Sequence, residues 1–420
     1  MTEPTDTAAP HRPPIDLRAT GLAWALAVVI TAVLVAATHY ESPDPDSSLH
    51  AGIAARISDR PLRQWIAPEW WGLWNSEGPY CEHPAGIFIL PAALARLGFP
   101  ATQAAYAVNA LYQAATFILV ALIAASVAAP RDARALGWIL QFILVAFVYR
   151  IRANHEFALL AALLFAVYST ERARTRPAWT VGMIAGFCAV LLVKGVFAFV
   201  VPISCALWLL AGAESAGDLR ARWKAWAAIA AMPLAGALVA WGYEAAYVAA
   251  TGRSFLAVYQ SRQLPATAVA EGSLVGRAAY SAVWYAARVL WYPLPFSLFA
   301  GIVAWRGVRS GKLWPWRRTQ PGEEPAASSL LQGAWFALAT AIVLLGAFSL
   351  AHRKADRYLF AVYFIVAAVG AIDAIHRFAW LRRLVERLDR PWVPAVAHVC
   401  LVALRLLTGD MLPGYTFWRS

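Results

Sequence analysis

Charged residues are scarce in this chain. They make up 14% of its 420 residues, whereas soluble domains carry about 25%. Hydrophobic residues make up 60%. This composition excludes a soluble globular enzyme and a disordered chain, because too few polar side chains are present to cover a water-facing surface. A polytopic membrane protein remains, in which lipid surrounds the apolar surface.

Cysteine is also scarce. The chain has four, of which Cys188, Cys205 and Cys400 lie in apolar runs and Cys81 lies alone in a polar stretch. This excludes a disulfide-rich secreted module, and no structural disulfide is expected. Because no Cys/His cluster has metal-ligand spacing, no cofactor is predicted, and the use of a divalent metal stays open.

Basic residues outnumber acidic ones. The chain has 36 Lys and Arg against 24 Asp and Glu, a net charge of +12. In a soluble protein this excess would suggest nucleic acid. In so apolar a chain it indicates cytoplasmic loops that face anionic lipid, and no nucleic-acid partner is expected. The 20 Trp and 15 Tyr residues suit the two membrane–water interfaces.

Long apolar runs predict an all-α fold with about eleven transmembrane helices. Residues 1–20 are polar and Pro-rich and are expected to be disordered in the cytoplasm. A transmembrane domain is expected over 21–408, followed by a short tail, 409–420, with no soluble C-terminal domain. The predicted spans are 21–38, 101–129, 135–150, 155–170, 178–193, 195–211, 225–250, 284–305, 331–350, 357–375 and 391–408.

Compact clusters of Arg and Lys predict the orientation, because cytoplasmic loops are rich in these residues. If segment 84–98 lies at the interface or re-enters, rather than spanning, all of these clusters fall on the cytoplasmic side. Lys194 then lies at an outer break between two spans. The protein is expected in a bacterial inner membrane with a cytoplasmic N-terminus. The stretches placed on the outer side are 40–83, 150–156, 251–283 and 352–357.

The first outer loop, within 40–100, carries the most candidate chemistry. Asp44 and Asp46 follow the first span, and Glu82, His83 and Pro84 end the loop. A carboxylate held at the membrane boundary can accept a proton from an alcohol. The same acids are also typical of solvated loops and helix caps. Between the acids and the loop end, an interfacial amphipathic helix is predicted by the spacing of Leu49, Ile53, Ala54 and Ile57.

This loop resembles that of the C-type-fold membrane glycosyltransferases, in particular the group of protein O-mannosyltransferases and lipid A aminoarabinose transferases. Those sequences carry an Asp-Glu pair four residues before a Tyr-Ala. Here Asp46 takes the place of the acid, Ser47 replaces the Glu, and His50 with Ala51 replaces the Tyr-Ala. The family's His/Lys-Pro-Pro corresponds to His83-Pro84-Ala85, so the second proline is absent.

Three later segments resemble motifs of the same family, in the same order. The polar stretch from Arg150 to Glu156 opens a span, and Lys194-Gly195 is followed by Pro202. The third segment, residues 353–359, reads Arg-Lys-Ala-Asp-Arg-Tyr-Leu and precedes an apolar run. Together the motifs extend over nearly the whole chain, and the orientation predicted from basic clusters puts all of them on the outer side.

The resemblance implies a glycosyltransferase that moves a sugar from a polyprenyl-phosphate donor to a hydroxyl of a lipid, polysaccharide or protein. It implies Asp46, with Asp44 as the substitute, as the catalytic base of a single inverting displacement. Cations at the outer surface suit a lipid-linked phosphate, and the implied phosphate ligands are His83, Lys194, Arg353, Lys354 and Arg357. Further candidate substrate contacts are Glu82, Arg152, His155, Glu156 and Tyr358.

Other functions stay open. A non-enzymatic lipid or polysaccharide carrier would place polar groups near the bilayer midplane on broken helices. Here they gather at one surface, which favours an enzyme. An O-antigen-ligase-like enzyme would carry its main loop late in the chain, whereas the large loop is early here. The cations themselves are also typical of contacts with lipid headgroups.

Overall fold

The computed structural model describes residues 15–70, 78–213, 215–267, 274–314, 325–350 and 355–408. Within these ranges the chain is helical, and the one strand-like pairing is an isolated bridge between Glu69 and Pro79. The predicted all-α fold is therefore confirmed. The expectations for residues 1–14, for the tail 409–420, and for Arg353 and Lys354 lie outside the described residues.

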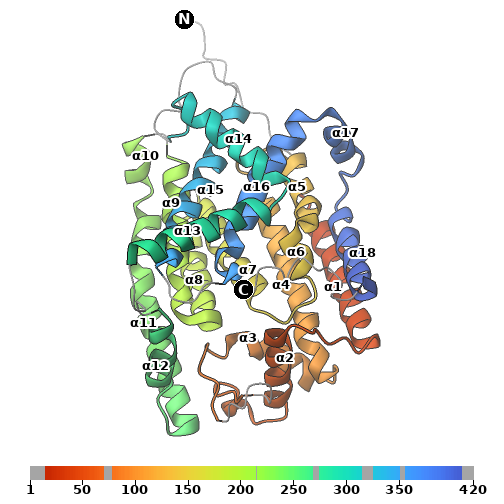
Figure 1. Ribbon diagram of the computed structural model, residues 1–420, viewed down its shortest axis with the longest axis vertical. Coiled ribbons are helices and arrows are strands. Elements are labelled where there is room, and N and C mark those ends of the chain that lie inside the picture. Colours follow the sequence, from red (N-terminus) through yellow and green to blue (C-terminus); the bar gives the residue numbers. More distant parts are fainter. Residues whose placement is uncertain are drawn as a thin grey trace, which may run out of the picture.

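The α-helices form a bundle whose elongated outline is seen in Figure 1. One end carries α2, α3 and α12 and is named the α2 end; the other carries α10 and α17 and is named the α17 end. The α-helices are α1 (Leu17–Ala37), α2 (Pro45–Ser58), α3 (Gly86–Arg96), α4 (Ala101–Ala124), α5 (Pro130–Ile139), α6 (Leu144–Val148), α7 (Glu156–Ala173), α8 (Thr180–Lys194), α9 (Val200–Ala211), α10 (Ala216–Ala221), α11 (Trp223–Thr251), α12 (Phe255–Thr267), α13 (Leu274–Trp291), α14 (Phe296–Arg309), α15 (Pro325–Ser349), α16 (Phe360–Arg377), α17 (Ala379–Arg387) and α18 (Val393–Thr408).

Six helical stretches in the described part are long and apolar enough to cross a membrane, or seven if the bent pair α13–α14 is one span. The chain bends by 109° between α13 and α14. The expectation of eleven spans is thus not confirmed. Several predicted runs form short or broken helices instead. Run 135–150, for example, is divided among α5, the 3₁₀ turn η2 (Leu140–Phe142) and α6.

The first predicted span and segment 84–98 both differ in detail from the apolar pattern. Helix α1 begins at Leu17 rather than at residue 21, because the Asp16 side chain caps it by accepting from the backbone N–H groups of Arg18 and Ala19, each at 3.0 Å. Segment 84–98 forms α3, whose 11 residues fall short of the ~20 that a spanning helix needs.

Helices α8 and α9 reverse direction at η4 (Gly195–Phe199). A methyl group on Gly182, near the start of α8, would lie 2.5 Å from Ser169 Oγ. Near the end of α9, Trp208 Nε1 donates to Glu171 Oε2 at 3.0 Å. Both contacts lie in the last turns of α7, so the chain must turn back between them. Lys194, the last residue of α8, lies at this turn.

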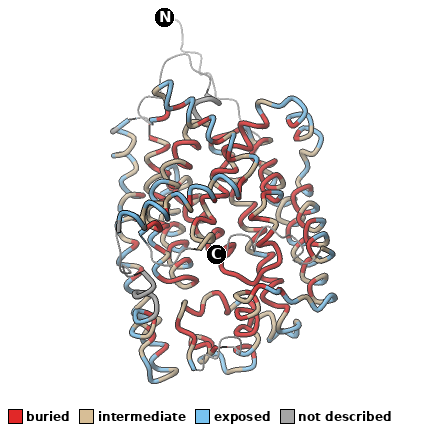
Figure 2. The backbone as a smooth tube through the Cα atoms, viewed as in Figure 1, coloured by how far each residue is buried: buried red, intermediate tan, exposed pale blue. Residues whose placement is uncertain are grey.

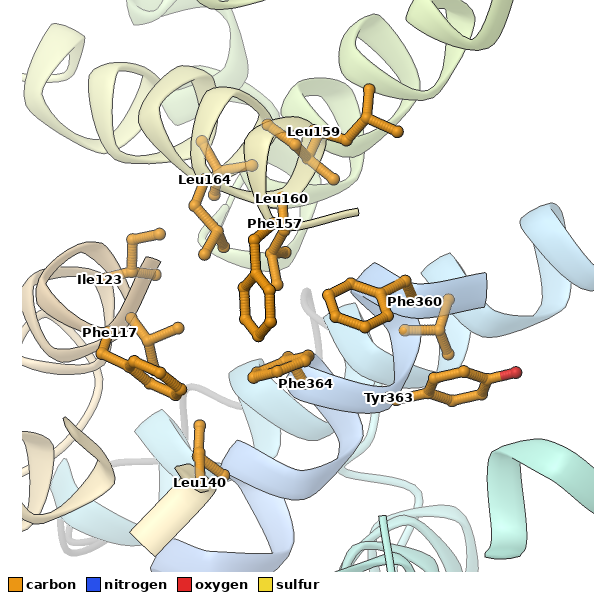
Figure 3. Close-up of a cluster of buried hydrophobic side chains, with 14 of the residues drawn as sticks. Phe117, Ile123, Leu140, Phe157, Leu159, Leu160, Leu164, Phe360, Tyr363 and Phe364 are labelled. Atoms are coloured by element: carbon orange, nitrogen blue, oxygen red, sulfur yellow. The ribbon is translucent and has the colours of Figure 1, made fainter. Parts of the chain in front are cut away.

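An aromatic core joins α4, α7 and α16 (Figure 3). Phe157 packs edge-on against Phe360 at 5.1 Å and against Phe364 at 5.8 Å between ring centroids. Phe117 lies 6.1 Å from Phe364. Buried residues run through the centre of the bundle, while much of α11 and α13 is exposed (Figure 2). Because Phe157 follows Glu156 directly and Phe360 lies three residues after Arg357, this core fixes the positions of both charged residues.

Candidate functional site

Asp44 is built into the start of α2. As the N-cap it accepts from Ser47 N at 3.1 Å and from Ser47 Oγ at 2.8 Å. Arg152 Nη1 lies 3.1 Å from the other carboxylate oxygen, Oδ1, and Asn154 Nδ2 donates at 3.4 Å to Oδ2, the oxygen that Ser47 bonds. The carboxylate therefore joins α2 to the 150–156 segment. A carboxylate this fully bonded has a structural role in the fold.

Asp46, two residues further on, faces a different environment. Its side chain is 38% exposed, against 7% for Asp44, and it accepts a hydrogen bond from Arg357 Nη1. Burial opposes the charge of Asp46, but the nearby Arg357 guanidinium outweighs this and leaves the pKa of the carboxyl below its ordinary value. His50, one helical turn along α2, also lies close enough to act on this charge.

Glu156, Lys194 and Arg357 extend this interaction into the protein. Glu156 Oε1 lies 3.7 Å from Lys194 Nζ and 3.9 Å from Arg357 Nε. The Glu156 side chain is 1% exposed, yet neither of its oxygens, nor Lys194 Nζ, has a hydrogen-bond partner among the described residues. Asp46, Arg357, Glu156 and Lys194 therefore form one chain of charges, named the charge chain. Its buried members retain unused hydrogen-bonding capacity.

The backbone turn after Lys194 depends on glycine. Gly195 has φ +59°, and a methyl group there would lie 2.3 Å from the Tyr259 hydroxyl. That hydroxyl accepts from Val196 N at 3.1 Å. Tyr259 stacks on Phe255 at 5.4 Å between ring centroids. Helix α12 thus holds the turn that presents Lys194 to the site.

Three histidines from three segments meet beside the charge chain. The ring centroid of His155 lies 4.7 Å from that of His50 and 4.5 Å from that of His83. His50 Nδ1 lies 3.1 Å from the Ala153 carbonyl oxygen. Both ring nitrogens of His155, and Nδ1 of His83, are buried with no partner among the described residues. We name His50, His83 and His155 the imidazole cluster.

An apolar cavity adjoins the charge chain. Glu156, Arg357 and Tyr358 line one part of it, and Leu163 is among the apolar residues that line the rest. Leu163 also lines a second, larger apolar cavity between α4, α7, α9, α15 and α16. An anion at the charge chain would therefore have apolar space beside it.

The structure brings together most of the residues singled out from the sequence. Lys194 Nζ also lies 5.7 Å from the ring centroid of Tyr358. Arg152 turns instead to Asp44, and Glu82 is half-buried. No group of three or more His, Cys, Asp or Glu residues in the described ranges is arranged to hold a metal ion.

Two contributors were missed from the sequence. His50 was noted only as a replacement for the family tyrosine, although its i, i+4 spacing from Asp46 on a predicted helix was a signal for proximity. Tyr259 carried no signal, because its contact with the Lys194 turn is visible only in three dimensions.

Asp356, next to Arg357, accepts hydrogen bonds from Arg288 Nε and from the Tyr292 hydroxyl, each at 2.6 Å. These bonds attach α13 to the segment that carries Arg357.

The fold is similar to that of crystal structures of ArnT, the lipid A aminoarabinose transferase, from Cupriavidus metallidurans. One is bound to undecaprenyl phosphate and one is in the apo state. Each matches with a TM-score of 0.60 and 16% identity, over 93% of this chain and 77% of the other. No family model and no curated protein sequence matches the chain. The structural match to the C-type glycosyltransferase fold that the motifs predicted is confirmed.

Proposed function

We propose that this protein transfers a sugar from a polyprenyl-phosphate donor to an acceptor hydroxyl at the outer face of a bacterial inner membrane. The observation that carries the proposal is the charge chain, in which buried Lys194 and Glu156 keep unused hydrogen-bonding capacity next to Arg357 and beside an apolar cavity. A lipid phosphate combines the two features that such a site accommodates, an anionic head and an apolar chain.

Lys194 and Arg357 would hold the donor phosphate, and the cavity lined by Leu163 would take the start of the polyprenyl chain. Cations in this position stabilise the charge that develops on phosphate as it leaves. Arg353 and Lys354, which precede Arg357 in sequence, remain proposed ligands of the same phosphate. The undecaprenyl phosphate in the ArnT crystal structure supports the choice of a polyprenyl carrier.

Asp46 would take the proton of the acceptor hydroxyl. The acceptor oxygen then attacks the anomeric carbon, and the bond from that carbon to the phosphate oxygen breaks with its electron pair on phosphate. One base and one direct displacement invert the configuration at the sugar. Arg357 pairs with Asp46 and also lies 3.9 Å from Glu156. A phosphate bound to Arg357 would therefore lie next to the base, as direct attack requires.

Release of polyprenyl phosphate tests this proposal. Membrane vesicles that contain the protein are incubated with a panel of polyprenyl-phosphate hexoses and pentoses, and free polyprenyl phosphate is measured. The wild type should consume at least one donor, and Asp46→Asn should lower the rate about 10²- to 10⁴-fold, the usual contribution of a general base.

Asp44→Asn is the matched control, because asparagine caps a helix about as well as aspartate. It should retain most of the activity. Equal rates for wild type and Asp46→Asn would contradict the assignment of the base. Binding of undecaprenyl phosphate without consumption of any donor would instead favour the alternative, a lipid or polysaccharide carrier.

A further inference from the structure

We propose that the imidazole cluster receives the proton that Asp46 removes from the acceptor and holds it beside the departing phosphate until the products leave. This inference rests on the proposed function and adds a destination for the proton. The geometric basis is that His50 lies one helical turn from Asp46, and that His155 contacts both His50 and His83. The cluster thus connects the base to the interior of the site.

The hydrogen bond of His50 fixes which nitrogen can take a proton. A carbonyl oxygen only accepts, so the 3.1 Å contact with Ala153 requires the proton of the neutral ring on Nδ1. Nε2 is then the nitrogen with a free lone pair. This is the arrangement in which a backbone carbonyl orients a histidine that exchanges protons at its other nitrogen.

The rings enter the reaction neutral. Burial lowers the pKa of His50, and burial together with the positive charge of Lys194 lowers the pKa of His83 and of His155 well below the ordinary value. Lys194 and Arg357 therefore act on the cluster through space. A phosphate held by these two cations would offset their charge and make a proton on the cluster more favourable.

The reaction increases the negative charge on the phosphate, which favours a proton held on the nearby imidazole cluster. A polyprenyl-phosphate sugar is a phosphodiester with one negative charge, and the polyprenyl phosphate that leaves is a monoester that can carry two. The acceptor loses its proton in the same step. If the proton passes from Asp46 to Nε2 of His50 and stays within the cluster, Asp46 becomes ionised again and the added phosphate charge has a new cation beside it.

Other titratable groups surround the cluster and have to be separated from it in a test. The pKa values of these rings respond to Asp46 on α2, Glu156 at the start of α7, Lys194 on α8 and Arg357 on η6 (Asp356–Leu359). Tyr80 lies 6.5 Å from His50 and 6.4 Å from His83 between ring centroids. His50 and Tyr112 of α4 also line one small cavity together. Arg152 lies on the same segment as His155.

Proton uptake on product binding tests the inference without any turnover. Undecaprenyl phosphate is titrated into the detergent-solubilised full chain at pH 7, by calorimetry in three buffers of different ionisation enthalpy. Cations that bind a phosphate lower its pKa, so the phosphate itself can only release protons. Any proton taken up from the buffer must therefore bind to the protein. We expect a net uptake of about half to one proton per phosphate bound.

His155→Gln and His83→Gln distinguish histidines from carboxylates as the source of uptake. Each should bind undecaprenyl phosphate and lose at least half of the uptake. His376→Gln is the matched control, because His376 bonds Asp132 near the α17 end, and it should behave as wild type. Two variants are used so that a folding defect in one leaves the other informative.

The possible results separate this inference from the function on which it rests. If undecaprenyl phosphate binds but wild type takes up no proton, the inference is wrong and the proposed function stands. If uptake persists in both histidine variants, the proton is held without His83 and His155, on His50 alone, Asp46 or Glu156, and the inference of a shared imidazole cluster is also wrong. If undecaprenyl phosphate does not bind at all, both the function and the inference fail.

Discussion

The two ends of the helical bundle use charged residues in opposite ways. At the α17 end, Arg134 and Asp389 form two hydrogen bonds, at 2.6 and 2.7 Å, between half-exposed side chains. At the α2 end, Lys194 lies 3.7 Å from Glu156, and both are almost fully buried. The first pair satisfies itself and joins α5 to the loop that follows α17. The second pair leaves its donors and acceptors unsatisfied, which is costly unless a ligand uses them.

Charge alone therefore does not mark a site in this chain. The α17 end has further close ion pairs, including Arg131 with Glu386 at 3.1 Å. Exposed ion pairs of this kind are typical of helix ends that face solvent. What distinguishes the α2 end is burial combined with loose pairing and an adjoining apolar cavity. The same contrast separates Asp44, which is fully bonded, from Asp46 only two residues away.

The largest expected difference between the two ends is their side of the membrane. Asp59 is exposed at the α2 end and Arg383 is exposed at the α17 end. In a Cys400→Ser background, which removes the exposed native cysteine, Asp59→Cys should react with an impermeant thiol reagent in intact cells. Arg383→Cys should react only after the cells are opened. Labelling in the reverse pattern would overturn the orientation predicted from the basic clusters.

A smaller effect is expected at the turn that presents Lys194. Tyr259→Phe keeps the stacking on Phe255 but removes the hydroxyl that accepts from Val196 N. The loss of one such hydrogen bond amounts to about 1 kcal/mol, so undecaprenyl phosphate should bind about fivefold more weakly. Titration calorimetry measures this affinity. Tyr280→Phe, at a tyrosine that is 60% exposed, should bind undecaprenyl phosphate normally. Equally weakened binding in both variants would show that α12 has no specific role in the site.

The smallest effect is expected at the α17 end. Arg134→Ala breaks the pair with Asp389, and half-exposed pairs of this kind contribute about 0.2–1 kcal/mol to stability. Thermal unfolding in detergent should show a small decrease in Tm, while the affinity for undecaprenyl phosphate stays unchanged. A marked loss of affinity in this variant would break the distinction between the two ends.

The sequence predicted the parts of the site that lie in short motifs. Asp46, Lys194 and Arg357 could be chosen because each motif combines a charged residue with an adjacent apolar run. The number of spans was harder to predict, since hydropathy does not show that run 135–150 breaks at η2 or that α13 and α14 meet at 109°. The partners of each charge, such as Glu156 between Lys194 and Arg357, depend on packing between helices far apart in sequence and could not be predicted.

The most direct test of the account is a double-mutant cycle on undecaprenyl phosphate binding. Lys194→Ala and Arg357→Ala should each weaken binding about ten- to a hundredfold, the range for hydrogen bonds to charged groups. If both cations hold one phosphate, the double variant should be clearly non-additive, because the two changes share a ligand and Glu156. Normal binding in both single variants would contradict the account and leave these cations as lipid-headgroup contacts.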